Sequence, residues 1–206
     1  MNEVEAGRRR VVGEDWGARN LDGQHFAQLD LSVVDLTELR AAGVTFTDCT
    51  FRRCRFNTSV FTDAAFTACT FTDCNFFDVR FVRCKLVGST FTDCQLDLLQ
   101  IEGGNWGFVS LRGADLSGTR VSATRLQEAD LEGVRAAQAS WRDVDLTGAS
   151  LAGVDLSGAD LRGSSLWSLD PRSAVLRGAI VTPGQALVLA TSLGLELREV
   201  DDEPPR

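Results

Sequence analysis

Residues 46–56 read FTDCTFRRCRF, and this stretch places a phenylalanine at every fifth position. The same period extends outward in both directions, from Trp16 to Val181, without a shift of register. Most of these positions hold Phe, Leu, Trp, Ile or Val. A period of five matches neither an α-helix, with about 3.6 residues per turn, nor a flat strand, with about 2. The pattern therefore predicts a repeat architecture in which each five-residue unit forms one side of a coil.

A second and smaller residue stands two positions before each of these apolar residues. In most units it is cysteine, alanine or valine, as at Cys49, Ala64 and Val79. The other three positions are mostly Asp, Thr, Arg, Ser or Gly. Each unit thus points two side chains inward and three outward. Such a unit buries its apolar surface only when coils stack on one another.

Further along the chain the units read GADLSGT (residues 113–119), EADLEGV (128–134) and GVDLSGADLRGSSL (153–166). These stretches resemble the A(D/N)LXX units of the pentapeptide-repeat family. The resemblance implies an all-β fold, a right-handed quadrilateral β-helix with four units per coil. It implies that residues 14–181 form one pentapeptide-repeat solenoid of about eight coils, stacked about 4.8 Å apart.

The segment before the repeat is polar. Residues 1–13 carry the short basic run from Arg8 to Arg10. Chain ends of this composition are commonly unstructured. We therefore expect a disordered N-terminal segment, in which the three arginines are either solvated or in contact with nucleic acid.

The segment after the repeat predicts a helix. Thr182 followed by Pro183 and Gln185 forms a capping box with proline in the first turn. Gly194 is a typical helix stop. Residues 182–200 are therefore expected to hold a short capping and dimerisation helix and then a short strand, and residues 201–206 a loose tail.

The predicted helix is apolar nearly all round. One apolar stripe would be enough to cover the open end of a β-helix. Family members with this layout form head-to-head dimers through such a helix, so the resemblance implies a homodimer, with capping of a monomer as the alternative. The expected interface residues are Leu187, Val188, Leu189, Ala190, Leu193 and Leu195.

The sequence offers no catalytic constellation. All six cysteines occupy the small inward position, where a thiol acts as a small apolar group rather than as a metal ligand or half of a disulfide. The single histidine, His25, is at an outward position, and no phosphate-binding glycine motif is present. We therefore expect a protein that is not an enzyme and binds no cofactor or metal.

The whole-chain layout is most similar to the Qnr and MfpA group of the family, which bind DNA gyrase, confer fluoroquinolone resistance and are described as mimics of B-form DNA. The resemblance implies DNA gyrase or topoisomerase IV as partner, with fluoroquinolone resistance or self-protection as the outcome. A dimer would carry a net charge of −16, twice the −8 of one chain. A DNA duplex as long as that rod carries roughly 47 negative charges. Charge mimicry is therefore partial, and a structural scaffold with an unidentified partner is the alternative.

Outward residues are the expected partner surface, because the repeat dictates only the inward ones. They comprise five aspartates that precede apolar centres and two outward apolar residues: Asp115, Asp130, Asp145, Asp155, Asp160, Val87 and Phe108. Val87 and Phe108 are predicted to share one face, one coil apart. No apolar run approaches the length of a membrane span, and no signal peptide is evident. We expect a cytoplasmic protein that contacts neither membrane nor nucleic acid directly.

Overall fold

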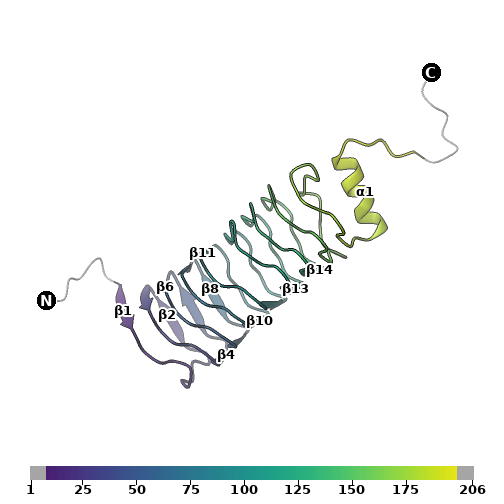
Figure 1. The fold of residues 1–206 in the computed structure, drawn as a ribbon. Helices are drawn as coiled ribbons and strands as arrows, with labels where there is room; N and C mark the ends of the chain where they lie inside the picture. The colour runs from purple at the N-terminus through teal and green to yellow at the C-terminus, as the bar shows by residue number, and fades with distance from the viewer. Residues whose placement is uncertain (1–7, 199–206) are drawn as a thin grey trace.

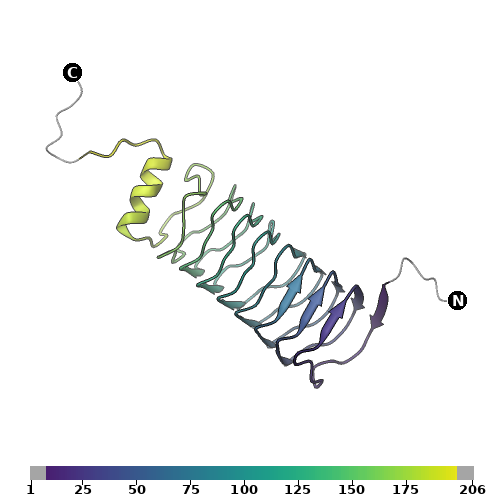
Figure 2. The ribbon, with the colours of Figure 1, turned by 180° about the vertical axis from the view of Figure 1, so that it is seen from behind.

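The computed structural model describes residues 8–198, which form an elongated rod of stacked coils with one helix at the C-terminal end (Figure 1). The first strand and the helix lie at opposite ends of the rod, as the view from behind also shows (Figure 2). The strands are β1 (Arg9–Val12), β2 (His25–Ala27), β3 (Leu29–Ser32), β4 (Arg40–Ala42), β5 (Thr45–Thr47), β6 (Thr50–Arg52), β7 (Val60–Thr62), β8 (Ala65–Thr67), β9 (Thr70–Thr72), β10 (Arg80–Val82), β11 (Thr90–Thr92), β12 (Gln100–Glu102), β13 (Arg120–Ser122) and β14 (Ser140–Arg142), and the helix is α1 (Pro183–Ser192).

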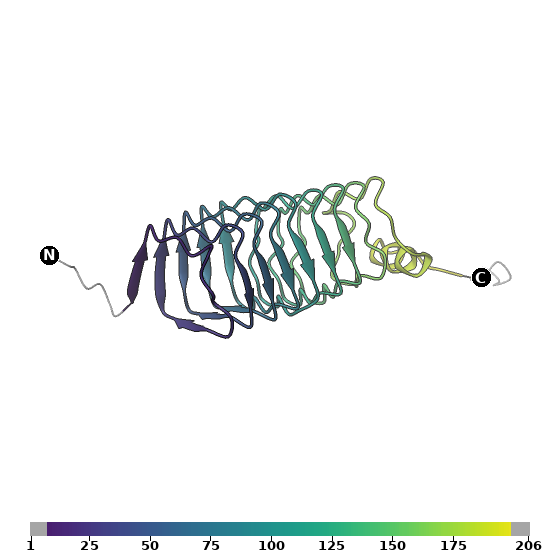
Figure 3. The same cartoon turned by 90° about the horizontal axis from the view of Figure 1, so that it is seen from below.

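Four parallel ladders form the walls of the rod. Strand partners are 20 residues apart in sequence, as in the pairs Phe46↔Phe66 and Phe61↔Phe81. The first side is the ladder β1-β3-β6-β9-β11, the third is β4-β7-β10-β12-β13-β14, and the fourth begins β2-β5-β8. The second side is built from single bridges, beginning Asp15↔Asp35. Four sides of five residues make the predicted coil, seen stacked in Figure 3, so the quadrilateral β-helix is confirmed.

The apolar centres fill the interior of the rod. The eight phenylalanines at these centres, from Phe46 to Phe81, are essentially inaccessible to solvent. Rings 20 residues apart stack face to face, with centroid separations of 4.9 Å for Phe51 and Phe71 and 4.5 Å for Phe56 and Phe76. Rings on adjacent sides meet edge to face. Each buried phenylalanine contributes roughly 1.5–3 kcal/mol, so this aromatic column is a principal source of stability.

The smaller inward residues confirm the interpretation of the cysteines. All six cysteines are within the described residues and are free thiols, five of them buried and Cys94 half-buried. Burial raises the pKa of the Cys84 thiol to about 11. Where the same position holds a hydroxyl it donates to a carbonyl, as Ser89 Oγ does to the Phe66 oxygen at 2.7 Å. The position is therefore structural throughout.

The prediction of a disordered N-terminus was wrong for Arg9–Val12. These residues form β1, which pairs in register with β3, and Val11 is buried. Arg8 donates to an Asp48 carboxylate oxygen at 2.6 Å. Val11 stands five residues before Trp16, so the repeat begins one unit earlier than expected. Residues 1–7 lie outside the described part of the chain.

The helix is confirmed with its predicted capping box. The Thr182 hydroxyl accepts the backbone N–H of Gln185, and the Gln185 side chain accepts the N–H of Thr182 at 2.8 Å. The Gln185 amide also donates to the carbonyls of Leu161 and Ser164, each at 2.7 Å. These bonds satisfy oxygens at the end of the solenoid, and Arg172 donates to the Leu193 carbonyl at 3.0 Å. The helix is thus fixed to the rod at both its ends.

Beyond the helix, the predicted short strand is not formed in residues 195–198, which have no regular structure. The rest of that prediction and the tail at 201–206 lie outside the described residues. Gly194 takes a φ of +84° as the helix ends, as expected for a helix stop. Between residues 8 and 198, no helix is long and apolar enough to cross a membrane.

Candidate partner-binding surfaces

The five candidate aspartates share one structural role at the bends of the coil. Each carboxylate accepts the backbone N–H of the residue two positions later, as Asp115 does from Ser117 at 3.0 Å and Asp155 from Ser157 at 2.9 Å. The hydrogen bond and charge of Arg162 lower the pKa of Asp160 to about 2. The five carboxylates therefore act as caps of the bends.

The structure does not bring the five aspartates together. Each step of five residues moves to the next side of the rod, so only residues separated by a multiple of 20 share a ladder. Asp115 and Asp155 lie on the second side, where both bridge to Arg135. Asp130 lies on the first side, Asp145 on the fourth and Asp160 on the third.

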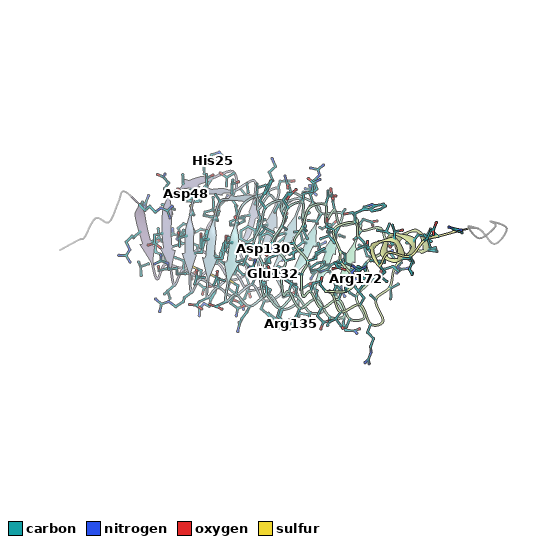
Figure 4. The ribbon with its side chains drawn as sticks, turned by 90° about the horizontal axis from the view of Figure 1, so that it is seen from above. His25, Asp48, Asp130, Glu132, Arg135 and Arg172 are labelled. Atoms are coloured by element: carbon teal, nitrogen blue, oxygen red, sulfur yellow. The ribbon has the colours of Figure 1, made fainter. Side chains whose placement is uncertain are left out.

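Many acidic side chains are paired with arginines of the next coil. Arg112 binds Asp130 at 3.0 Å and Glu132 at 2.7 Å, and Arg135 binds Asp115 at 3.1 Å. In Figure 4 Asp130 and Glu132 lie close together, and Arg135 lies nearer the edge of the rod. Exposed pairs of this kind contribute about 0–1 kcal/mol each. Their larger effect here is to reduce the negative field of the rod.

The second side keeps the clearest excess of acidic residues. Outward positions on this side hold the acids Asp15, Asp35, Glu38, Asp78, Asp97, Asp115 and Asp155 against the bases Arg55, Arg135 and Arg177. The third side includes the basic residues Arg40, Arg80 and Arg120 of one ladder. The excess of acidic residues is therefore concentrated on the second side, and any DNA-like field must be local to it.

The fourth side carries a hollow of about 260 Å³. As predicted, Val87 and Phe108 lie together, and both line this hollow. Gly107 precedes Phe108 and also lines the hollow, where it is buried and places no side chain at its outward position. Gln127 and Glu128 of the next coil complete the wall. His25 lies elsewhere on this side, exposed, with its Nδ1 2.7 Å from the Thr45 hydroxyl.

Sequence reasoning missed Gly107 and Glu128 as part of this site. Gly107 is neither acidic nor apolar with a side chain, so it was not among the outward residues that the sequence singled out, whereas its role is to leave space. The available signal was the 20-residue spacing, which puts Gly107 directly between Val87 and Gln127.

The C-terminal end is the second candidate surface. Of the six predicted interface residues, Leu187 (55% exposed), Leu193 and Leu195 are exposed. Val188, Leu189 and Ala190 are half-buried, and Leu189 packs against the core. The predicted set therefore divides between a face on the rod and a face open to solvent.

Sequence reasoning also missed apolar residues on the last coil. Three of its sides expose one each at an outward position: Trp167, Val175 and Ile180. The exposed leucines of the helix and of the turn after it, Leu187, Leu193 and Leu195, are here called the end surface. Clusters of exposed apolar residues are typical of protein contact sites.

Residues 8–198 contain no group of three or more His, Cys, Asp or Glu side chains placed to hold a metal ion. The surfaces that the described chain offers are thus an acidic side, a hollow and an apolar end.

Comparison with known proteins agrees with this geometry. A pentapeptide repeat region model matches residues 44–119, and a model of eight pentapeptide repeats matches residues 124–163 and 155–182. Two structures of trypsin-treated variants of QnrB1, a plasmid-mediated fluoroquinolone resistance protein, share the fold. One has 19% identity, a TM-score of 0.62, and coverage of 93% of this chain and 98% of its own. The other has 20% identity, a TM-score of 0.52, and coverage of 94% and 100%.

No curated protein matches the chain in sequence. The two family models nevertheless span most of the rod, and the same ladder register runs through the short interval between them. The chain belongs to the pentapeptide-repeat family.

Proposed function

We propose that this chain is a non-enzymatic binding protein that acts as a homodimer on DNA gyrase or topoisomerase IV and gives fluoroquinolone resistance or self-protection. The observation that carries the proposal is the whole-length likeness to QnrB1, over 93% of this chain and 98% of that one. At 19% identity the likeness is one of fold. The charged sides and the apolar end supply the surfaces that such an activity requires.

The second side would meet the DNA-binding surface of the topoisomerase. Its ladder repeats at the strand spacing of about 4.8 Å, and carboxylates such as Asp115 and Asp155 recur along it. A basic groove made for phosphates would attract this acidic side more strongly than the third side, where acidic and basic residues are nearly balanced. The contact should weaken as salt is added, because exposed charges are screened within about 10 Å at moderate ionic strength.

The test measures supercoiling by purified gyrase, and its rescue from ciprofloxacin, in the presence of the protein. The double variant Asp115→Asn with Asp155→Asn keeps the bend caps but removes two second-side charges, so it should weaken the effect on gyrase. The matched control, Asp63→Asn with Asp143→Asn, removes two charges from the third side and should act like the unaltered chain. A protein that neither inhibits nor rescues gyrase would refute the proposal.

The end surface would join two copies of the chain. We expect light scattering at micromolar concentration to give twice the mass of one chain. Leu187→Glu puts a charge on the open helix face without touching the rod, so this variant should be monomeric. Val33→Glu, at an equally exposed position on the first side, should remain dimeric. A monomeric unaltered chain would overturn the dimer.

The ion pairs favour a second candidate, a scaffold for a partner outside DNA metabolism. Arg83 with Asp63 and Arg55 with Asp35 neutralise acids that a DNA mimic would leave free. A pull-down that recovers another partner, together with neither gyrase subunit, would support this alternative.

A further inference from the structure

We propose that the hollow on the fourth side binds an arginine side chain of the partner protein. The inference deepens the proposed function and rests on it for the identity of the partner, whereas the preference for a guanidinium group rests on the hollow itself. The hollow is lined by Val87, Asn105, Gly107, Phe108, Gln127, Glu128 and Thr147.

The shape of the hollow suits one long side chain. Its volume of about 260 Å³ is far larger than the share of about 30 Å³ that one water molecule occupies in the liquid. Gly107 forms its buried floor. Val87 and Phe108 offer apolar surface, against which the methylene stem of an arginine packs while its charged end stays at a polar wall.

The chemistry of the lining suits a cation. Glu128 is the charged residue among those that line the hollow, and within residues 8–198 its carboxylate has no salt bridge and no side-chain hydrogen bond. The Gln127 amide nitrogen donates to Asp145 at 2.8 Å, which leaves its oxygen as an acceptor. A guanidinium group makes paired hydrogen bonds to a carboxylate and lies over an aromatic face such as that of Phe108.

Phe108 has a backbone conformation that is unfavourable for a residue with a large side chain. Its φ is +58°, in the left-handed region, and its side chain is 64% exposed. The equivalent position of the preceding coil holds Gly88, which adopts such angles freely, and that of the following coil holds Glu128, with a φ of +56°. A left-handed residue at this position is a regular feature of the repeat. A large aromatic side chain there is less favourable than glycine and leaves most of its surface exposed to a partner.

Two basic residues on the fourth side restrict the negatively charged part of the hollow to its Glu128 wall. Lys85 and Arg125 form β-bridges to Asn105 from the coils on either side of it. Asn105 stands three residues before Phe108, and Arg125 stands three residues before Glu128. Neither of them lines the hollow. A bound guanidinium group is therefore expected at the Glu128 wall rather than at the Asn105 wall.

The first experiment follows the Gly107 backbone amide by NMR while N-acetylarginine amide is added. We expect saturable shifts at millimolar concentration in the unaltered chain and at least a fivefold weaker response in Phe108→Gly and in Glu128→Gln. Val33→Gly is the matched control. It removes another exposed apolar residue with a φ of +57°, and it should bind like the unaltered chain. Equal or better binding of N-acetylglutamate amide, or no shift with arginine amide, would overturn the proposal.

The second experiment repeats the gyrase assay with the same variants. We expect Phe108→Gly to lose most of its effect on gyrase while its melting temperature rises, and Val33→Gly to gain stability without losing that effect. If the unaltered chain binds arginine amide but has no effect on gyrase, the proposed function is refuted, whereas the binding of a guanidinium group in the hollow is supported. If gyrase responds equally to Phe108→Gly and to the unaltered chain, the hollow is refuted as a partner site and the proposed function stands.

Discussion

Phe66→Ala is expected to lower the free energy of unfolding by about 3–5 kcal/mol, the usual cost of truncating a buried phenylalanine. The ring is 1% exposed. It stacks on Phe46 at 5.1 Å and meets the edge of Phe61 at 5.2 Å. Coils on both sides prevent collapse of the resulting cavity. In a solenoid each coil contacts only its neighbours, so the substitution would weaken the coupling between the two halves of the rod.

Phe26→Ala is the matched control, because Phe26 has the same repeat position on the same side but lies near the end of the rod. Its ring is only half-buried and stacks on Phe46 from one direction. We expect a clearly smaller loss, measured by urea unfolding of both variants followed by circular dichroism. Equal losses at the two positions would contradict the view that burial between two coils sets the cost.

The fold was predictable because the interior of the rod imposes a strict pattern. A narrow lumen requires one large and one small inward residue in every unit, and Phe51 with Cys49 satisfies that requirement as visibly as Leu131 with Ala129. The first coil was harder to predict. Val11 fits the period, but the arginines that precede it have the composition of a disordered end. Pairing with β3 outweighs that local composition.

The surfaces were less predictable, because one repeat position occurs on all four sides. Asp115 and Asp130 look equivalent in sequence but face different directions, since their separation is not a multiple of 20. Val87 and Phe108 were correctly placed together by the coil length. The hollow between them depends on a missing side chain at Gly107, and missing side chains leave no hydrophobic pattern to detect.

Gly104→Ala is expected to be the most damaging change of a single small residue, with a loss of about 2–5 kcal/mol from backbone strain and overpacking together. Gly104 occupies the small inward position before Trp106, with a φ of +94°. A Cβ there would lie 2.0 Å from the Cys84 carbonyl oxygen. That oxygen accepts the Asn105 N–H at 3.0 Å, so it cannot turn away without breaking the ladder.

Gly113→Ala separates the two contributions to that loss. Gly113 also has a positive φ, of +68°, but an added Cβ would meet nothing within 4 Å. The free energy of unfolding of Gly113→Ala should therefore fall only by the cost of a left-handed alanine, about 1–2 kcal/mol. Thermal melts of the two variants measure the difference, and equal losses would mean that the coils separate freely at Cys84. A larger loss for Gly104→Ala would show that the constraint is the close approach of the backbones at Gly104 and Cys84. This close approach lets the lumen hold the fully buried Trp106 without a break in register.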